Sequence, residues 1–232
     1  MLSLWFKLVE YVSKTIMGRS SSINKVSRFD VMLLGDSGVG KTSLLMRIMD
    51  EKSIELKKTS NTTGPEQVIK TIVLPDAYIR LNICDTPGPE RFIHLLRTYY
   101  KNCQGAILVY DIQNRKSFER VQDWVFTLRE EISSEFVIAL AGNKMDMENN
   151  RHVSKEEAIQ FATAHNCLFL ETSAKSNENV SYTFKALVLA LHNQQEERNK
   201  VAKNQVSSNE VDPDPEGRQN EQRRYFFPCS IC

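Results

Sequence analysis

Residues 35–42, Gly35-Asp-Ser-Gly-Val-Gly-Lys-Thr42, form a glycine-rich stretch whose residue types and spacing suit phosphate chemistry. The stretch follows an apolar run and opens a helical pattern over residues 43–49. Glycines let successive backbone N–H groups curl around phosphate oxygens, and a helix N-terminus adds partial positive charge. Lys41 would place a cation on the β- and γ-phosphates, and Thr42 would offer its hydroxyl to Mg²⁺. The predicted phosphate contacts are Gly35, Asp36, Ser37, Gly38, Val39, Gly40, Lys41, Thr42 and Ser43.

Two further tetrapeptides suit recognition of a base. Asn143-Lys144-Met145-Asp146 follows an apolar run, and the Asp146 carboxylate can accept two parallel hydrogen bonds from guanine N1–H and the 2-amino group. Adenine lacks that amino group, so a buried site of this kind rejects it. The second tetrapeptide, Thr172, Ser173, Ala174 and Lys175, would close over the base with backbone N–H groups. Either one alone also fits a solvated loop, but together, after a phosphate loop, they indicate a guanine site.

The elements that position these loops alternate between short apolar runs and helical patterns, which predicts an α/β fold with a mostly parallel sheet. Pro75-Asp76 reads as a hairpin turn, so the strands on either side of it should be antiparallel. Ser154 and Glu157 have capping-box spacing, which marks a helix start. The predicted strands are residues 29–34, 67–74, 78–84, 106–111, 136–141 and 167–170, and helices are expected to start near residues 41, 116, 154 and 179.

Composition divides the 232 residues into an extension (1–27), a domain (28–194) and a tail (195–232). Hydrophobic residues make up 41% and charged residues 25%, as in ordinary globular proteins. A formal net charge of +1 gives no general attraction to nucleic acid. Five scattered cysteines do not suggest a disulfide framework, so a reducing cytosol is expected. The tail up to residue 222 lacks aromatic residues and is expected to be a disordered linker.

The ordered motifs GDSGVGKT, DTPG, NKMD and TSAK resemble the Ras superfamily of small GTPases, and residues 80–92 and 108–112 resemble its Rab branch. The resemblance implies a P-loop fold with a six-stranded sheet, a GTP/GDP site and Mg²⁺. It implies that Asp85 holds Mg²⁺ through water and that the Gly88 N–H touches the γ-phosphate. Thr62 looks like the switch I threonine that binds Mg²⁺ and the γ-phosphate, although an ordinary loop threonine is the alternative. Lys41 and Thr62 are the catalytic residues that the resemblance implies, and Thr42, Thr62 and Asp85 the metal ligands.

Pro89 departs from the family pattern, because it stands where a glutamine usually orients the attacking water. Proline has neither a side-chain donor nor a backbone N–H. Slow intrinsic hydrolysis is therefore expected, with stimulated hydrolysis available if a partner supplies a glutamine. The rival interpretation is a non-hydrolysing GTP-binding scaffold. A small-molecule kinase fits poorly, since the chain lacks an arginine-rich lid.

The effector face and switch I also depart from the family. Rab proteins usually present three aromatic residues between the switches; the matching positions here are Gln67, Cys84 and either Tyr99 or Tyr100. Two of the three aromatics are absent, and Cys84 is expected to pack rather than to act in redox chemistry. Ile54 replaces the aromatic ring that normally flanks guanine, which predicts faster nucleotide exchange. The expected partners are those of the family: an exchange factor, a GTPase-activating protein, effectors, a prenylation escort and a GDP-dissociation inhibitor.

The two ends of the chain suggest contact with a membrane. Cys229 and Cys232 lie in a C-a-a-X-like terminus and are expected to carry one or two prenyl groups, which would hold the protein on the cytosolic face of an intracellular membrane. No stretch reaches the roughly 18 apolar residues of a transmembrane helix. Residues 2–16 form an apolar helical stripe, which fits a membrane-surface helix or one packed on the domain. Met17 is an alternative start, after which a myristoylation pattern would follow.

Overall fold

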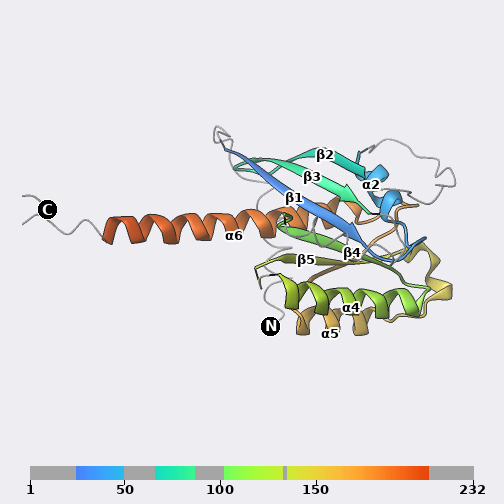
Figure 1. Cartoon of the computed structure of the whole chain (residues 1–232). Helices are drawn as coiled ribbons and strands as arrows, with labels where there is room; N and C mark the ends of the chain where they lie inside the picture. The colour runs from blue at the N-terminus through green and yellow to red at the C-terminus, as the bar shows by residue number, and fades with distance from the viewer. Residues whose placement is uncertain (1–24, 50–65, 87–101, 133–134, 209–232) are drawn as a thin grey trace, which may run out of the picture. The chain divides into compact units, whose positions relative to one another are not determined.

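The fold is a central sheet with helices on both faces (Figure 1). A computed structural model describes residues 25–49, 66–86, 102–132 and 135–208. The six strands have the order β2-β3-β1-β4-β5-β6. All neighbouring pairs are parallel except β2 and β3, which are antiparallel. The predicted fold class, a mostly parallel six-stranded sheet, is confirmed.

Each predicted strand is present, and its ends lie within three residues of the predicted ones. The strands are β1 (Val26–Leu34), β2 (Glu66–Val73), β3 (Tyr78–Asp85), β4 (Gly105–Asp111), β5 (Val137–Asn143) and β6 (Leu168–Glu171). The hairpin predicted at Pro75-Asp76 joins β2 to β3, and the Leu74 N–H donates to the Ala77 carbonyl across it at 2.9 Å. β1 begins three residues before the apolar run because backbone pairing with β3 extends back to Val26.

The helices start where local chemistry predicts. They are α2 (Lys41–Met49), α4 (Arg115–Glu131), α5 (Lys155–Ala164) and α6 (Val180–Ser208), with the 3-10 helix η2 (Met145–Asn150) after β5. Ser154 is the N-cap of α5, and its side chain accepts a hydrogen bond from the Glu157 N–H at 3.2 Å. Asn114 caps α4 in the same way by accepting from the Ser117 N–H.

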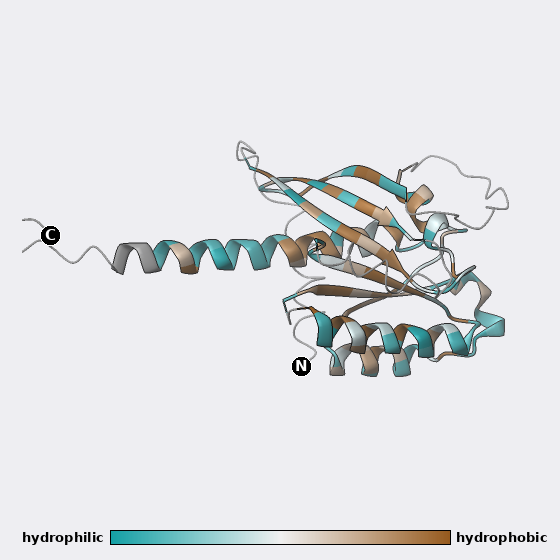
Figure 2. Ribbon diagram, in the orientation of Figure 1, coloured by the Kyte–Doolittle hydropathy of each residue, from teal (hydrophilic) through white to brown (hydrophobic). Residues whose placement is uncertain are grey.

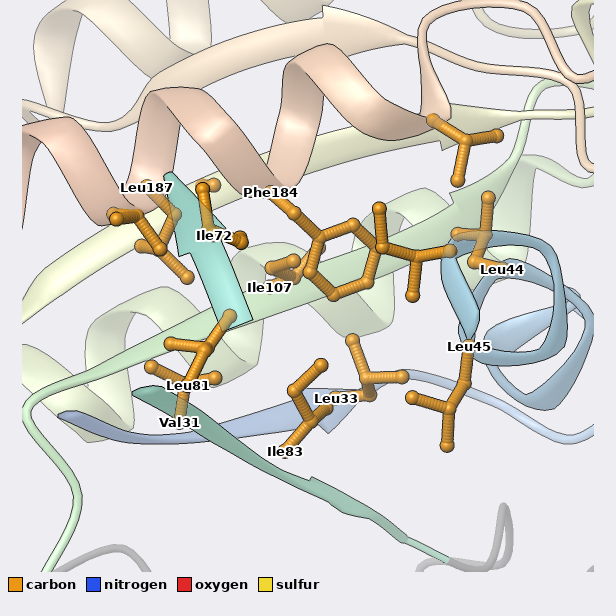
Figure 3. Packing of buried hydrophobic residues seen from close by; sticks show 14 of the residues in the cluster. Val31, Leu33, Leu44, Leu45, Ile72, Leu81, Ile83, Ile107, Phe184 and Leu187 are labelled. Atoms are coloured by element: carbon orange, nitrogen blue, oxygen red, sulfur yellow. The ribbon is translucent and has the colours of Figure 1, made fainter. Parts of the chain in front are cut away.

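Two apolar clusters fill the space between the sheet and its helices. The first lies under α2 and α6, and the second lies under α4 and α5. Successive residues of β1 alternate between them: Leu33 belongs to the first and Leu34 to the second, as the two-residue period of a strand requires. Figure 2 shows the central strands as mainly hydrophobic. Figure 3 shows Phe184 of α6 beside Ile107 of β4, with Leu44 of α2 in the same cluster.

Helix α6 corrects the expected boundary of the tail. It runs without interruption to Ser208, so residues 195–208 are helical rather than a disordered linker. Gln, Glu, Lys, Arg and Ala are good helix formers, and extending an existing helix avoids the cost of a new nucleus. The chain divides into two compact units, residues 1–195 and 196–232, and α6 contains residues of both. Residues 1–24 and 209–232, with the predicted N-terminal stripe and terminal cysteines, lie outside the described residues.

Among the helices of the described residues, none is both long and apolar enough to cross a membrane.

Candidate functional site

The carboxyl ends of the parallel strands bring the predicted motifs to one edge of the sheet. Leu34 precedes the glycine-rich loop, Asp85 ends β3, Asp111 ends β4, Asn143 ends β5 and Glu171 ends β6. Parallel registers join these strands, so their last residues share an edge. Ligands bind at this edge in open α/β sheets.

The phosphate loop holds its lysine close to its own backbone. The Lys41 Nζ donates to the carbonyls of Gly35 at 2.7 Å and Asp36 at 2.9 Å. The side chain is buried, and burial lowers its pKa to about 8, against the opposing attraction of Asp85 and Asp36. A buried ammonium with incomplete charge compensation favours an anion beside it. The loop therefore has the electrostatics of a phosphate site.

Gly40 shows why the loop needs glycine. Its φ is +102°, in the region that L side chains avoid, and a Cβ there would lie 2.3 Å from the Asn143 Nδ2. The absence of a side chain allows the Asn143 amide to reach past Gly40 and donate to the Val39 carbonyl at 2.8 Å. The glycine thus permits contact between the phosphate loop and the first base-site tetrapeptide.

Asn143 links all three predicted motifs. Its Nδ2 bonds to Val39 in the phosphate loop, and its Oδ1 accepts from the Thr172 hydroxyl and the Ala174 N–H, both at 3.2 Å. The residue is 1% exposed, so these bonds form away from water. The Met145 N–H also donates to the Thr172 carbonyl at 3.1 Å. One amide side chain therefore uses both of its polar ends to fix the loops relative to one another.

Asp146 lies beside the second base-site loop. Its carboxylate accepts from the Ser173 hydroxyl at 2.6 Å and lies 3.8 Å from the Lys175 Nζ. The loop is closed by a pair of backbone hydrogen bonds between Ser173 and Glu178. These contacts orient a partly exposed carboxylate beside the loop 172–175, an arrangement that can pair with the edge of a base.

Thr42 and Asp85 form a pair of hard oxygen donors. The Thr42 hydroxyl lies 2.5 Å from the Asp85 Oδ2. Asp85 is fully buried, at 0% exposed, and lies close enough to Lys41 to oppose in part the lowering of its pKa by burial. Among the described residues, no three His, Cys, Asp or Glu side chains gather into a metal cluster. A hydroxyl and a carboxylate beside a phosphate loop fit Mg²⁺, which takes few protein ligands and completes its shell with phosphate and water.

Three interactions near the site are absent from the sequence-based prediction. The Lys144 Nζ pairs with the Asp111 Oδ2 at 2.6 Å, and its backbone is left-handed with a φ of 68°. The Arg151 guanidinium bonds both oxygens of Glu171, which directly precedes the second base-site loop. Arg47 of α2 donates to carbonyls of that loop. Asp111 is the last residue of a predicted strand, so its place at the ligand-binding edge of the sheet follows from the sequence. Nothing in the local pattern indicates the role of Arg47.

Of the predicted effector positions, Gln67 and Cys84 lie in the described part of the chain. They face one another across β2 and β3, with Gln67 exposed and Cys84 buried at 6% exposure. Burial, with a smaller effect from Asp85, raises the pKa of the Cys84 thiol, which fits a packing role. The other predicted positions lie outside the described residues: Ile54, Thr62, Gly88, Pro89, Tyr99, Tyr100, Cys229 and Cys232.

Comparison with known proteins identifies the family. Residues 30–193 match the Ras family. The chain is 41% identical over 161 residues to the Ras-related protein Rab-5A of Dictyostelium discoideum, covering 69% of this chain and 79% of that protein. It is 42% identical over 160 residues to the Ras-related protein Rab-13 of Canis lupus familiaris, covering 68% of this chain and 77% of that protein. The chain therefore belongs to the Ras family, as a small GTPase of the Rab branch that hydrolyses GTP to GDP and phosphate.

Proposed function

We propose that this GTPase is a membrane-associated switch, whose GTP-bound form recruits effectors in vesicle trafficking and whose GDP-bound form releases them. The observation that carries the nucleotide site is Asn143, whose amide bonds to the phosphate loop at Val39 and to the second base-site loop at Thr172 and Ala174. A ligand with phosphates at one end and a base at the other would touch both loops. A guanine nucleotide has that form.

In the proposed complex, residues 35–43 hold the phosphates, with Lys41 charged against the β- and γ-phosphates. Asp146 accepts the guanine N1–H and 2-amino group, while Asn143, Lys144 and the loop 172–175 support the base. The Thr42 hydroxyl and, through water, the Asp85 carboxylate would hold Mg²⁺, which would supply positive charge to the phosphates. Thr62 and Gly88 are proposed to add contacts to the γ-phosphate, which would order the two switches only in the GTP state.

Base recognition is tested by Asp146→Asn. The amide would offer an N–H where the carboxylate accepts, so affinity for GDP should fall while affinity for xanthosine diphosphate, which carries a carbonyl at position 2, should rise. Competition against a fluorescent nucleotide measures both, with ADP as the control that neither protein should bind well. If Asp146→Asn binds GDP as tightly as the native chain, Asp146 does not read the base.

Slow intrinsic hydrolysis is proposed from Pro89, since proline cannot orient the attacking water. The test is single-turnover hydrolysis of GTP by the full chain with saturating Mg²⁺, beside Pro89→Gln. Pro89→Gln is expected to be faster by about tenfold or more. If the native chain is already as fast as ordinary small GTPases, another group positions the water. If both proteins bind GTP and hydrolyse it equally slowly, Pro89 does not limit the intrinsic rate.

Membrane attachment is proposed through prenylation of Cys229, Cys232 or both, on the cytosolic face of an intracellular membrane. An exchange factor, a GTPase-activating protein, a prenylation escort and a GDP-dissociation inhibitor would serve this cycle. Mass spectrometry of the chain expressed in eukaryotic cells would count the prenyl groups. Cys229→Ser, Cys232→Ser and the double variant should lower membrane association stepwise if both cysteines are modified. Unchanged association of the double variant would contradict the proposal.

A further inference from the structure

Arg47 is a buried cation in the last turn of α2. It is 7% exposed, although arginine is among the residues least often buried. A buried charge costs free energy unless hydrogen bonds compensate for it. The Arg47 Nε donates to the Ala174 carbonyl at 3.0 Å, and a terminal guanidinium nitrogen donates to the Lys175 carbonyl at 3.1 Å. The planar guanidinium thus bonds two successive carbonyls of the second base-site loop.

These bonds link the two halves of the proposed nucleotide site. Arg47 lies on the same short helix as Lys41 and Thr42, which belong to the phosphate half of the site. The distance between them along the helix axis is about 8–9 Å. Ala174 belongs to the base half, and Asn143 already holds its backbone N–H at 3.2 Å. Ala174 is therefore held at its N–H from β5 and at its carbonyl from α2. Movement of the base-site loop away from the base would have to break the bonds to Arg47 or displace α2.

We propose that Arg47 is a positioning residue that couples the phosphate helix to the guanine loop and thereby slows nucleotide release. The inference rests on the proposed guanine nucleotide site. Arg47 does not touch the ligand; it acts by keeping residues 174 and 175 in the position that encloses the base. Because its partners are on the base side, its effect is the same for GDP and GTP and persists when Mg²⁺ is chelated.

The test compares Arg47→Met with a matched control, Arg129→Met. Arg129 is also a helical arginine that donates to backbone carbonyls, those of Phe136, His165 and Asn166, but it lies in α4 and makes none of these bonds to the nucleotide loops. Methionine keeps most of the apolar stem and removes the guanidinium. Both variants lose charged hydrogen bonds, so both should lower the melting temperature of the full chain.

Dissociation of fluorescent GDP distinguishes a role in nucleotide retention from a role in stability alone. Arg47→Met is expected to release GDP about tenfold faster or more, the equivalent of losing one charge-assisted hydrogen bond, whereas Arg129→Met should stay within about twofold of the native rate. The ratio for Arg47→Met should be the same with GTP and after addition of a chelator. In the GDP complex, hydrogen exchange at the amides of residues 174–176 should be faster in Arg47→Met.

Equal off-rates in the two variants at similar melting temperatures would overturn the coupling and leave Arg47 as a stabilising residue only. Should Arg47→Met not fold, Arg47→Lys decides: it keeps the charge but cannot bond both carbonyls in one plane, so a folded Arg47→Lys with the native off-rate overturns the inference. The proposed function fails separately, since in that case the native chain itself would not bind GDP.

Discussion

The substitution Tyr110→Phe is expected to stabilise the protein, whereas most substitutions in a core destabilise it. The ring lies in β4 and is fully buried, at 0% exposed, where it packs against Phe118 with ring centroids 4.9 Å apart. Its hydroxyl is also buried, and no hydrogen-bond partner for it exists among the described residues. Gly142 on β5 makes room for the oxygen, because a Cβ at that position would lie only 2.6 Å from it. Tyr110→Phe would remove the oxygen and keep the ring.

The magnitude follows from the cost of burying an unpaired hydroxyl, about 1–3 kcal/mol in protein mutational data. The substitution also loses the dispersion contacts of one oxygen atom, which are worth a few tenths of a kcal/mol. Tyr110→Phe is therefore expected to raise the free energy of unfolding by about 1–2 kcal/mol. For a domain of this size, that increase corresponds to a melting temperature higher by about 2–8 °C.

The assay is urea unfolding of both proteins at the same saturating GDP and Mg²⁺ concentrations, because bound ligand adds to apparent stability. A pH series gives a second readout. Burial, and then Glu171, raises the pKa of the Tyr110 phenol above its ordinary value of about 10. Above pH 10 the unfolded tyrosine loses its proton while the folded one keeps it, so the unfolded state binds fewer protons and stability falls with rising pH. The advantage of Tyr110→Phe should therefore increase above pH 10.

A loss of about 1 kcal/mol or more in Tyr110→Phe at neutral pH would refute this reasoning. It would mean that the hydroxyl has a partner, such as a buried water that bonds to it. The off-rate of GDP serves as a check on the site, which the substitution should leave unchanged, since the Tyr110 hydroxyl makes no hydrogen bond to Asn143 or to the two base-site loops among the described residues.

Three other predictions concern buried groups at or near the site. Lys41 has a pKa of about 8, and a bound phosphate would favour its charged form, so GDP affinity should fall as pH rises through 8, by up to about tenfold per pH unit. GMP, which has the same base and lacks the β-phosphate, should show no such fall in competition titrations. Glu171→Gln should lower the free energy of unfolding by about 1–2 kcal/mol, because the Arg151 guanidinium loses its buried charged partner but keeps its bonds to Glu148, and urea unfolding that shows no loss would contradict this. Burial raises the pKa of the Cys84 thiol and raises that of Cys103 to about 12, so peptide mapping after alkylation at pH 8 should find both labelled slowly in the native protein and rapidly in urea.

Most of the fold could be predicted because its signals are local. Apolar runs of four to eight residues mark strands, and Ser154 or Asn114 at a helix start supplies a cap. The errors lie where a signal is weak or depends on another element. β1 begins at Val26, which is exposed and has its place through pairing with β3. Helix α6 continues to Ser208 on intrinsic propensity rather than on an apolar stripe, so its polar continuation resembled a linker.

The sequence by itself determined the kind of site, because a phosphate loop is built from one contiguous stretch. The spacing of its glycines, followed by Lys41 and Thr42, is enough to indicate phosphate binding. Tertiary structure alone decided how the motifs are joined. Asn143 bonds to Val39 across 104 residues of sequence, and Arg47 bonds to Ala174 across 127. Such bonds depend on strand order and helix packing, which bring the two ends of the domain to the same edge of the sheet. A local pattern contains no information on that approach, so the residues that hold the site together become visible only in the folded chain.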